Sequence, residues 1–430
     1  MIRYMATAKK PTRGAHLSAA VAACTVLACT ALVAGLGVIV TAGGRDQRSF
    51  HLPSVMRIRD DFPRIDIVDL PTATGPLYHL VVAAISGPFG MGEAGTQIVG
   101  ALFAAALAAL AVWHARSVPT PYGRALAVAP LLLSVYFWQS ALWMLTDDAA
   151  ILFTMAALVL LERTLTTRRQ VAIGVLIAAA IATRQTFVWA LVPAILACLW
   201  SMRGRPWPTR VGALARLCVP GVAVLVALVT MWGGLTPPAM RGFNASTQSW
   251  TSIAFTFAVA AIFAVPVLIA TMRTDVIRER ARVGVAVGAV AALAASVFPS
   301  AATSFPDDSR RGGVVWAVVA QVPDVAGRSP ILVILAFIGG FACTVVFFIL
   351  ERRTAIILAS ALCALAVATA PGAQLYQKYA ELPIGMFAVL AIVALFADGQ
   401  IRRTWPLLGL AGFQALLTIG VVVMPIVRAV

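Results

Sequence analysis

Charged residues are scarce in this sequence. Asp, Glu, Lys and Arg make up 12% of its 430 residues, whereas 61% are hydrophobic and the mean hydropathy is +0.92. A water-soluble domain carries about 25% charged residues, roughly twice that share. Soluble folds are therefore excluded, and we expect a polytopic membrane protein.

Other markers are missing too. The chain has no P-loop pattern, no run of His and Cys at metal-ligand spacing and no low-complexity segment. No cofactor is therefore expected, which leaves only a carboxylate-bound Mg²⁺ or Mn²⁺ ion open. The six cysteines fall inside or beside apolar stretches, so no disulfide framework is expected. They are Cys24, Cys29, Cys198, Cys218, Cys343 and Cys363.

Apolar stretches recur along the chain, and a membrane crossing needs about 20 such residues. The stretches that fit, several of them short, are roughly 17–41, 96–113, 125–143, 147–161, 170–183, 186–201, 211–233, 251–271, 283–299, 330–349, 354–370, 380–397 and 404–427. Residues 76–90 are also apolar but broken by Gly and Pro, which predicts a re-entrant or half-depth helix. The predicted fold is an all-α polytopic membrane protein with about 13 transmembrane helices plus this segment. It forms one transmembrane domain over 1–430 without a separate soluble domain.

Positive charge predicts the orientation. With the N-terminus in the cytoplasm, the segments placed inside hold 21 of the 33 Lys and Arg and 5 of the 17 Asp and Glu. The entire net charge of +16 then falls on the cytoplasmic face, as the positive-inside rule requires. We therefore expect a multi-pass plasma-membrane protein with an exoplasmic C-terminus. The basic charge suits the lipid bilayer and argues against nucleic acid as a partner.

Five polar segments fall on the predicted exoplasmic face. They are the first exoplasmic loop 42–75, the pair Asp147-Asp148, Arg184-Gln185, GFNAS at 242–246 and QLYQKYAELP at 374–383. Each alone has a simple explanation: a helix cap, an arginine reaching the interface, a solvated loop or a surface helix. Asn244-Ala-Ser246 also matches a common glycosylation pattern. Their combination at one face favours a functional site.

Five stretches carry a family resemblance. They are DQRSFHLP (46–53), IVDLPTATGPLYHL (67–80), RQTFVWA (184–190), WGGLTPPAMRGFN (232–244) and YQKYAELP (376–383). Together they resemble the GT-C glycosyltransferases, above all the dolichyl-phosphoglucose α-1,2-glucosyltransferase family. The chain departs from that pattern in carrying Gln47 for Glu, Phe187 for Asn and one extra residue between Asp46 and Phe50.

The resemblance implies an inverting hexosyltransferase that uses a polyprenyl-phosphate sugar donor and a glycan, glycolipid or protein acceptor on the exoplasmic face. Asp46 would be the general base, with Asp60 and Asp61 of the same loop as alternatives. Arg184 or Lys378 would hold the phosphate, since arginine suits a two-donor grip. The residues expected to contact substrate are His51, Asp69, Tyr78, Asp147, Arg184, Gln185, Gln377, Lys378, Tyr379 and Glu381.

Two other classes of function stay open. One is a transporter or flippase for a lipid-linked or acidic solute, with Arg184 and Asp147 as intramembrane binding charges. The other is a non-catalytic scaffold. A transporter usually keeps its charges near the membrane midplane, whereas these cluster at one face. The composition, rich in Ala, Val and Arg and poor in Lys, is typical of a GC-rich bacterial genome, in which such enzymes decorate the cell envelope.

Overall fold

The computed structural model describes residues 13–242, 249–300, 311–372 and 374–430. The chain is 77% helical, so the predicted all-α class is confirmed apart from one pair of very short strands. Strands β1 (Arg311–Gly312) and β2 (Leu375–Tyr376) pair in parallel.

The helices follow one another along the chain with short connections. In the first half they are α1 (Arg13–Leu36), α2 (Ala42–Asp46), the π-helix η1 (Gln47–His51), α3 (Leu52–Asp60), α4 (Leu77–Ser86), α5 (Glu93–Gly100), α6 (Leu102–His114), η2 (Ala115–Ser117), α7 (Pro121–Leu132), α8 (Val135–Leu142), α9 (Asp147–Leu161), α10 (Thr167–Thr183), η3 (Gln185–Ala190) and α11 (Leu191–Ser201). In the second half they are α12 (Trp207–Trp232), η4 (Pro238–Met240), α13 (Thr251–Thr271), α14 (Thr274–Val297), α15 (Val314–Val319), α16 (Pro330–Ile349), α17 (Arg352–Ala368), α18 (Lys378–Ala397), α19 (Trp405–Thr418), η5 (Ile419–Val423) and α20 (Met424–Ala429).

Eight helical segments of the described residues are long and apolar enough to cross a membrane. They are Gly14–Leu36, Glu93–Ser117, Trp207–Trp232, Thr251–Thr271, Thr274–Val297, Pro330–Ile349, Lys378–Ala397 and Trp405–Ala429. A ninth is reached if α7 and α8, which bend by 69° at their junction, count as one span. These long apolar helices support the expected multi-pass membrane protein.

The expected count of 13 crossings is not confirmed. Four expected stretches form α9, α10, η3 with α11, and α17, but each of these helices has fewer than 18 residues. At about 1.5 Å per residue, the 15-residue α9 reaches about 22 Å, less than a hydrocarbon core of about 30 Å. The cause is polar sequence at the helix ends, because α9 begins at Asp147 and α10 ends before Arg184.

The short helix expected within 76–90 is present as α4, which has 10 residues. It ends at a turn of glycines in which Gly90 has a positive φ of 56°. One face of α4 packs on α3, where Val82 of α4 and Val55 and Ile58 of α3 are buried in one apolar cluster. This packing fixes the direction in which the first residues of α4 point.

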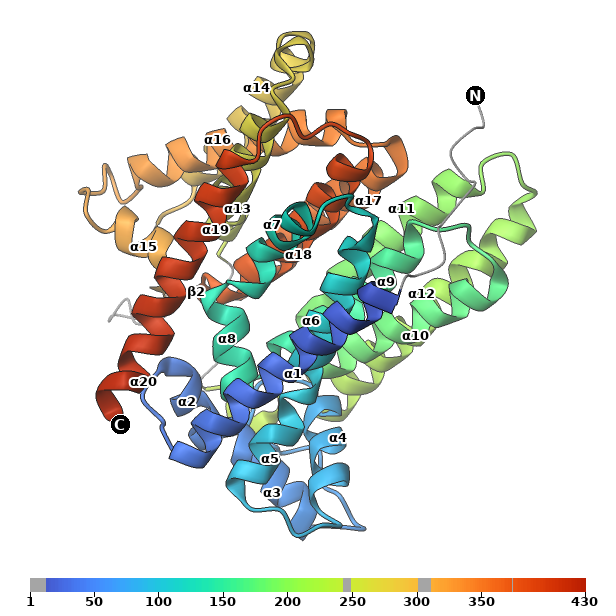
Figure 1. Ribbon diagram of the computed structural model, residues 1–430. Coiled ribbons are helices and arrows are strands. Elements are labelled where there is room, and N and C mark those ends of the chain that lie inside the picture. Colours follow the sequence, from blue (N-terminus) through green and yellow to red (C-terminus); the bar gives the residue numbers. More distant parts are fainter. Residues whose placement is uncertain (1–12, 243–248, 301–310, 373) are drawn as a thin grey trace.

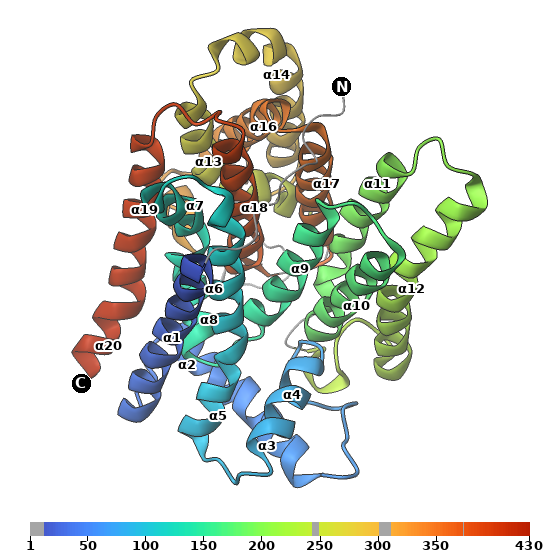
Figure 2. The ribbon, with the colours of Figure 1, turned by 45° about the vertical axis from the view of Figure 1, so that its right-hand side comes forward.

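The two ends of the helix bundle are distinct. Helices α2 to α5 gather at the lower end in Figures 1 and 2, while the loop before α14 lies at the upper end. Segments predicted to be cytoplasmic from their charge also contact one another. Nη2 of Arg353 donates to the carbonyl of Arg163 at 2.6 Å, and the guanidinium of Arg352 lies 4.4 Å from the ring centroid of Trp200. Because Arg163 follows α9, these contacts lie at the opposite end of that helix from Asp147.

Candidate functional site

Two ion pairs meet where the ends of α2, α9, α10 and α18 come together. Nζ of Lys378 lies 3.1 Å from Oδ2 of Asp46, and Nη1 of Arg184 lies 2.5 Å from Oδ1 of Asp147. The ring of Tyr379 serves both cations: its centroid is 5.5 Å from Nζ of Lys378 and 5.1 Å from Cζ of Arg184. We call these five residues the ion-pair cluster.

Each charged member of the ion-pair cluster stands at a helix end. Asp46 closes α2, and Asp147 opens α9, where the helix N-terminus favours a carboxylate. Arg184 follows α10 with an extended backbone (φ −146°, ψ 110°), and Lys378 is the first residue of α18. Helix ends release side chains from the apolar helix bodies, so four charges meet without interrupting a long span.

The two ion pairs differ in exposure. The side chains of Arg184 and Asp147 are 11% and 8% exposed, whereas those of Lys378 and Asp46 are 20% and 32% exposed. The first pair is therefore the more costly to break, because a buried charge that loses its partner is not rehydrated. The second pair is the one whose cation can be drawn to an incoming anion.

Gln377 and Glu381 hold the beginning of α18 rather than facing the ion pairs directly. Oε1 of Gln377 accepts from the amide of Val315 at 2.9 Å, and its Nε2 donates to Oε2 of Glu381 at 2.5 Å. The other oxygen of Glu381 accepts from Oγ of Ser134 at 2.8 Å. All three side chains are buried, so they fix where Lys378 leaves the helix.

A pair of histidines lies beside the ion-pair cluster. Nδ1 of His51 is 3.0 Å from Nε2 of His79, and the two rings stack with centroids 5.2 Å apart. Burial lowers the pKa of His51 well below its usual value, and the nearby charges of His79, Lys378 and Arg184 lower it further. Burial likewise lowers the pKa of His79 to about 4. Both imidazoles are therefore neutral at physiological pH.

The position of His51 depends on an irregular turn. The chain has one residue more between Asp46 and Phe50 than the GT-C pattern, and η1 is a π-helix over this stretch. A π-turn takes up one extra residue and rotates the side chains that follow it. Asp46 and His51 therefore lie at the two ends of a single irregular turn.

Two polar groups behind the histidines are enclosed. The hydroxyl of Tyr78 and both carboxylate oxygens of Asp148 have no hydrogen-bond partner among the described residues. The ring of Tyr78 meets that of His79 edge-on, with centroids 5.4 Å apart. Gly100 makes room for the phenol, since a Cβ there would come within 2.4 Å of the hydroxyl.

Asp69 and Gln185, expected to contact substrate, join loops in this structure. Oδ1 of Asp69 accepts from the amide of Ala239 at 3.0 Å. Nε2 of Gln185 donates to the carbonyls of Ala73 and Leu235 at 2.8 and 2.6 Å. These bonds tie the first exoplasmic loop to the segment after α12 and to the start of η3.

The alternative bases lie apart from the ion-pair cluster. Asp60 is exposed at the end of α3, and Asp61 lies 3.7 Å from Arg57, which also pairs with Asp66 at 3.2 Å. The structure thus brings Asp46, and neither Asp60 nor Asp61, into contact with Lys378. Residues 243–248, including the Asn244 pattern, lie outside the described residues.

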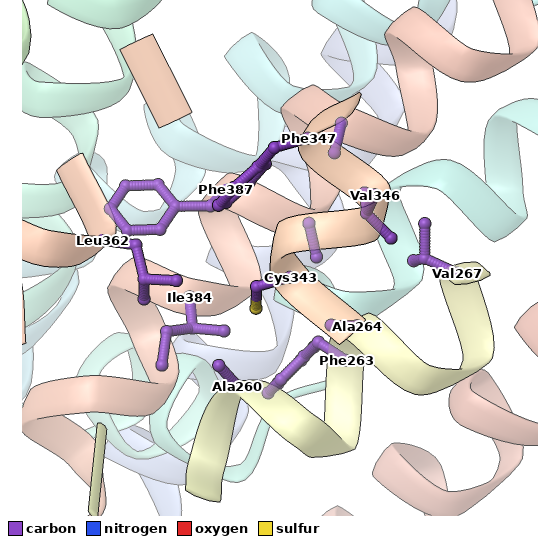
Figure 3. Close-up of a pocket in the computed structure, with 12 residues that line it drawn as sticks. Ala260, Phe263, Ala264, Val267, Cys343, Val346, Phe347, Leu362, Ile384 and Phe387 are labelled. Carbon is purple, nitrogen blue, oxygen red and sulfur yellow. The ribbon is translucent and has the colours of Figure 1, made fainter. Parts of the chain in front are cut away.

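The apolar cavities of the described chain lie away from these charges. One of about 40 Å³ is enclosed by α13, α16, α17 and α18, where Phe263, Cys343, Ile384 and Phe387 surround it (Figure 3). Another of about 320 Å³ opens between α13 and α19 beside Trp405. No group of three or more His, Cys, Asp or Glu able to hold a metal ion is found among the described residues.

His79 and Ser134 are the site residues that sequence reasoning missed. His79 reads as an interfacial residue of an apolar helix, yet it is fully buried against His51. A usable signal was its place directly after Tyr78 in a stretch already singled out. Ser134 had no such signal, because its contact with Glu381 spans 247 positions of sequence.

Comparison with known proteins adds no family. No protein-family model matches the chain, and no curated protein matches its sequence. The likeness to the GT-C glycosyltransferases therefore stays a prediction that depends on the quoted stretches.

Proposed function

We propose that this chain is an inverting membrane glycosyltransferase of the GT-C type. It would transfer a hexose from a polyprenyl-phosphate donor to a glycan, glycolipid or protein acceptor. The observation that supports the proposal most is the ion-pair cluster. It sets Asp46, the carboxylate beyond the first long helix, beside two cations that come from positions 184 and 378.

The proposed topology follows the charge distribution. The short helices α9, α10, α11 with η3, and α17 would cross the membrane together with the longer spans and the bent pair α7–α8, giving thirteen crossings. The N-terminus would be cytoplasmic and the C-terminus exoplasmic. The ion-pair cluster would then face the exoplasmic side, where a polyprenyl-phosphate sugar presents its head group.

The phosphate of the donor would bind between Lys378 and Arg184. The ion-pair cluster is neutral in the empty site, because its two cations match its two carboxylates. An anionic ligand must therefore take a cation from one of them. Lys378 is the more exposed cation, so we assign it the exchange from Asp46 to the phosphate, while Arg184 stays with Asp147.

The transfer step then uses the freed carboxylate. Asp46 accepts the proton of the acceptor hydroxyl as that oxygen forms its bond to the anomeric carbon. The bond from the anomeric carbon to the phosphate oxygen breaks on the opposite side, and its electron pair leaves with polyprenyl phosphate. Lys378 and Arg184 stabilise the departing charge. Because attack and departure lie on opposite faces of the sugar, the configuration inverts.

Transport of a lipid-linked or acidic solute is the second candidate. The enclosed carboxyl of Asp148 supports it, since unpaired acids inside membrane proteins commonly serve ion or proton pathways. The placement of the ion-pair cluster at helix ends supports transfer more, because it leaves the long spans free of charge.

The test incubates purified protein with a panel of radiolabelled polyprenyl-phosphate sugars and membrane extract, and then identifies the labelled product. Asp46→Asn keeps the size of the side chain and removes its proton affinity, so transfer should fall by about 10²–10⁴-fold. Asp60→Asn is the matched control in the same loop, at a side chain exposed to solvent.

The outcomes separate the assignments. Near-normal transfer by Asp46→Asn with an inactive Asp60→Asn would move the base to Asp60. Retention of activity by both variants would remove the general-base reading. If the unaltered protein transfers no sugar from the panel but moves a labelled lipid phosphate across proteoliposomes, the transporter hypothesis replaces the enzyme.

A further inference from the structure

The histidine pair differs from an ordinary buried pair in one atom. Nδ1 of His79 is enclosed, and Nδ1 of His51 is taken up by His79. Nε2 of His51 has no hydrogen-bond partner among the described residues, yet it is not one of the enclosed atoms. It is thus the one nitrogen of the pair that a ligand can reach.

The protonation of the pair follows from its surroundings. His79 is neutral and carries one proton, and a contact with the Gly75 backbone favours a proton on its ring. Nε2 of His79 faces His51, so the proton belongs on Nδ1 of His79 and Nε2 accepts. Nδ1 of His51 must then donate, which leaves Nε2 of His51 as a bare lone pair.

We infer that His79 is a positioning residue that fixes His51 as a neutral hydrogen-bond acceptor, and that Nε2 of His51 binds a hydroxyl group of the sugar. This inference rests on the proposed function for the identity of the ligand. The tautomer that His79 imposes does not depend on it.

The charges near His51 divide the site into two halves. Lys378 and Arg184 provide the positive charge, and both disfavour a proton on His51. His51 is therefore unsuited to holding phosphate and suited to accepting from an O–H donor. A sugar offers several hydroxyl donors, whereas an ionised phosphate group offers none. The two halves together select a lipid phosphate that carries a sugar over one that does not.

The test uses diethyl pyrocarbonate, which reacts with the lone pair of a neutral imidazole, and locates the product by mass spectrometry. An imidazole with the ordinary pKa of about 6.5 should react about fourfold more slowly at pH 6.0 than at pH 7.5. We expect His51 to change by less than twofold over that range and His79 to remain unmodified. The exposed His16 reports the reagent concentration in each sample.

Two variants at one position test the role of His79. His79→Gln keeps an acceptor near the position of Nε2 and should retain the rate at which His51 is modified. His79→Phe fills the space without an acceptor and should slow that modification several-fold, because the proton of His51 can then move to Nε2. Equal rates in the protein and in both variants would overturn the positioning role.

Ligand protection tests the hydroxyl contact on the unaltered protein, so it does not depend on whether the Phe variant folds. Citronellyl-phosphate hexoses, tried as a set, should include one that protects His51, whereas citronellyl phosphate alone should not. Equal protection by both kinds of probe would contradict the hydroxyl contact. Protection by the sugar lipid without any transfer to an acceptor would sink the proposed function and leave this inference standing.

Discussion

Replacing Arg184 with Met is expected to lower the free energy of unfolding by about 3–5 kcal/mol, because it leaves Asp147 buried without its partner. Methionine matches the length of the arginine stem and keeps most of its apolar contact. The loss therefore reports the charge and its hydrogen bond rather than packing.

The magnitude follows from the geometry of the pair. Two unit charges about 4 Å apart attract by about 4 kcal/mol at an effective dielectric constant of 20. The N–O distance is 2.5 Å and both side chains are about nine-tenths buried, so solvent screens little of this attraction. Removing both charges together should cost much less, since no buried charge is then left over. The double variant Arg184→Met with Asp147→Leu should regain most of the lost stability but none of the activity.

The assay is unfolding by SDS in mixed micelles, followed by tryptophan fluorescence. The control is Glu279→Gln, which breaks the Arg280–Glu279 pair. That pair has the same 2.5 Å separation, but its side chains are 42% and 64% exposed. An exposed pair contributes at most about 1 kcal/mol. A loss in Arg184→Met no larger than in Glu279→Gln, or a double variant no more stable than the single one, would refute the reasoning.

Three further outcomes are expected. Arg184→Lys should weaken donor use by about 1.5–3 kcal/mol in kcat/KM, because lysine cannot reproduce a planar two-donor contact; unchanged kinetics would remove Arg184 from phosphate binding. Gly75→Ala should destabilise the fold by about 1–3 kcal/mol, since its Cβ would lie 2.2 Å from the carbonyl of Ala182, whereas Gly92→Ala, with open space around it, should be neutral in the same unfolding assay. The pKa of His79 falls on folding from 6.5 to about 4, so the unfolded chain takes up the proton first. Stability is full above pH 6.5 and should fall by about 3 kcal/mol as the pH drops to 4; His79→Phe should flatten that dependence.

Hydropathy predicted most of the long helices because a membrane-spanning helix must be apolar over its whole length. The stretches 251–271 and 330–349 coincide with α13 and α16. It failed where polar residues end a helix early, as at Asp147, since an apolar run does not show how far the regular backbone continues. The bend between α7 and α8 was also missed, although Ser134, which caps α8, marks it.

The candidate site was predictable as a set of residues but not as a set of contacts. Charge at one predicted face singled out Asp46, Arg184 and Lys378, because an apolar chain seldom places charges without a role or a solvated end. Which cation pairs with which acid could not be read from the sequence, since Asp46 and Lys378 are 332 positions apart. That pairing depends on how α2 and α18 meet in the fold.

The histidines show where sequence reasoning reaches its limit. His51 was singled out because it follows Asp46 closely, while His79 was set aside because a lone histidine in an apolar helix is usually structural. Packing of α3 on α4 brings the two rings together, and packing is set by apolar neighbours such as Val55 and Val82 rather than by the histidines. The same packing encloses His79 and leaves one nitrogen of His51 accessible. A residue's chemistry here is therefore decided by the apolar contacts of the helix that carries it, which a list of polar residues does not contain.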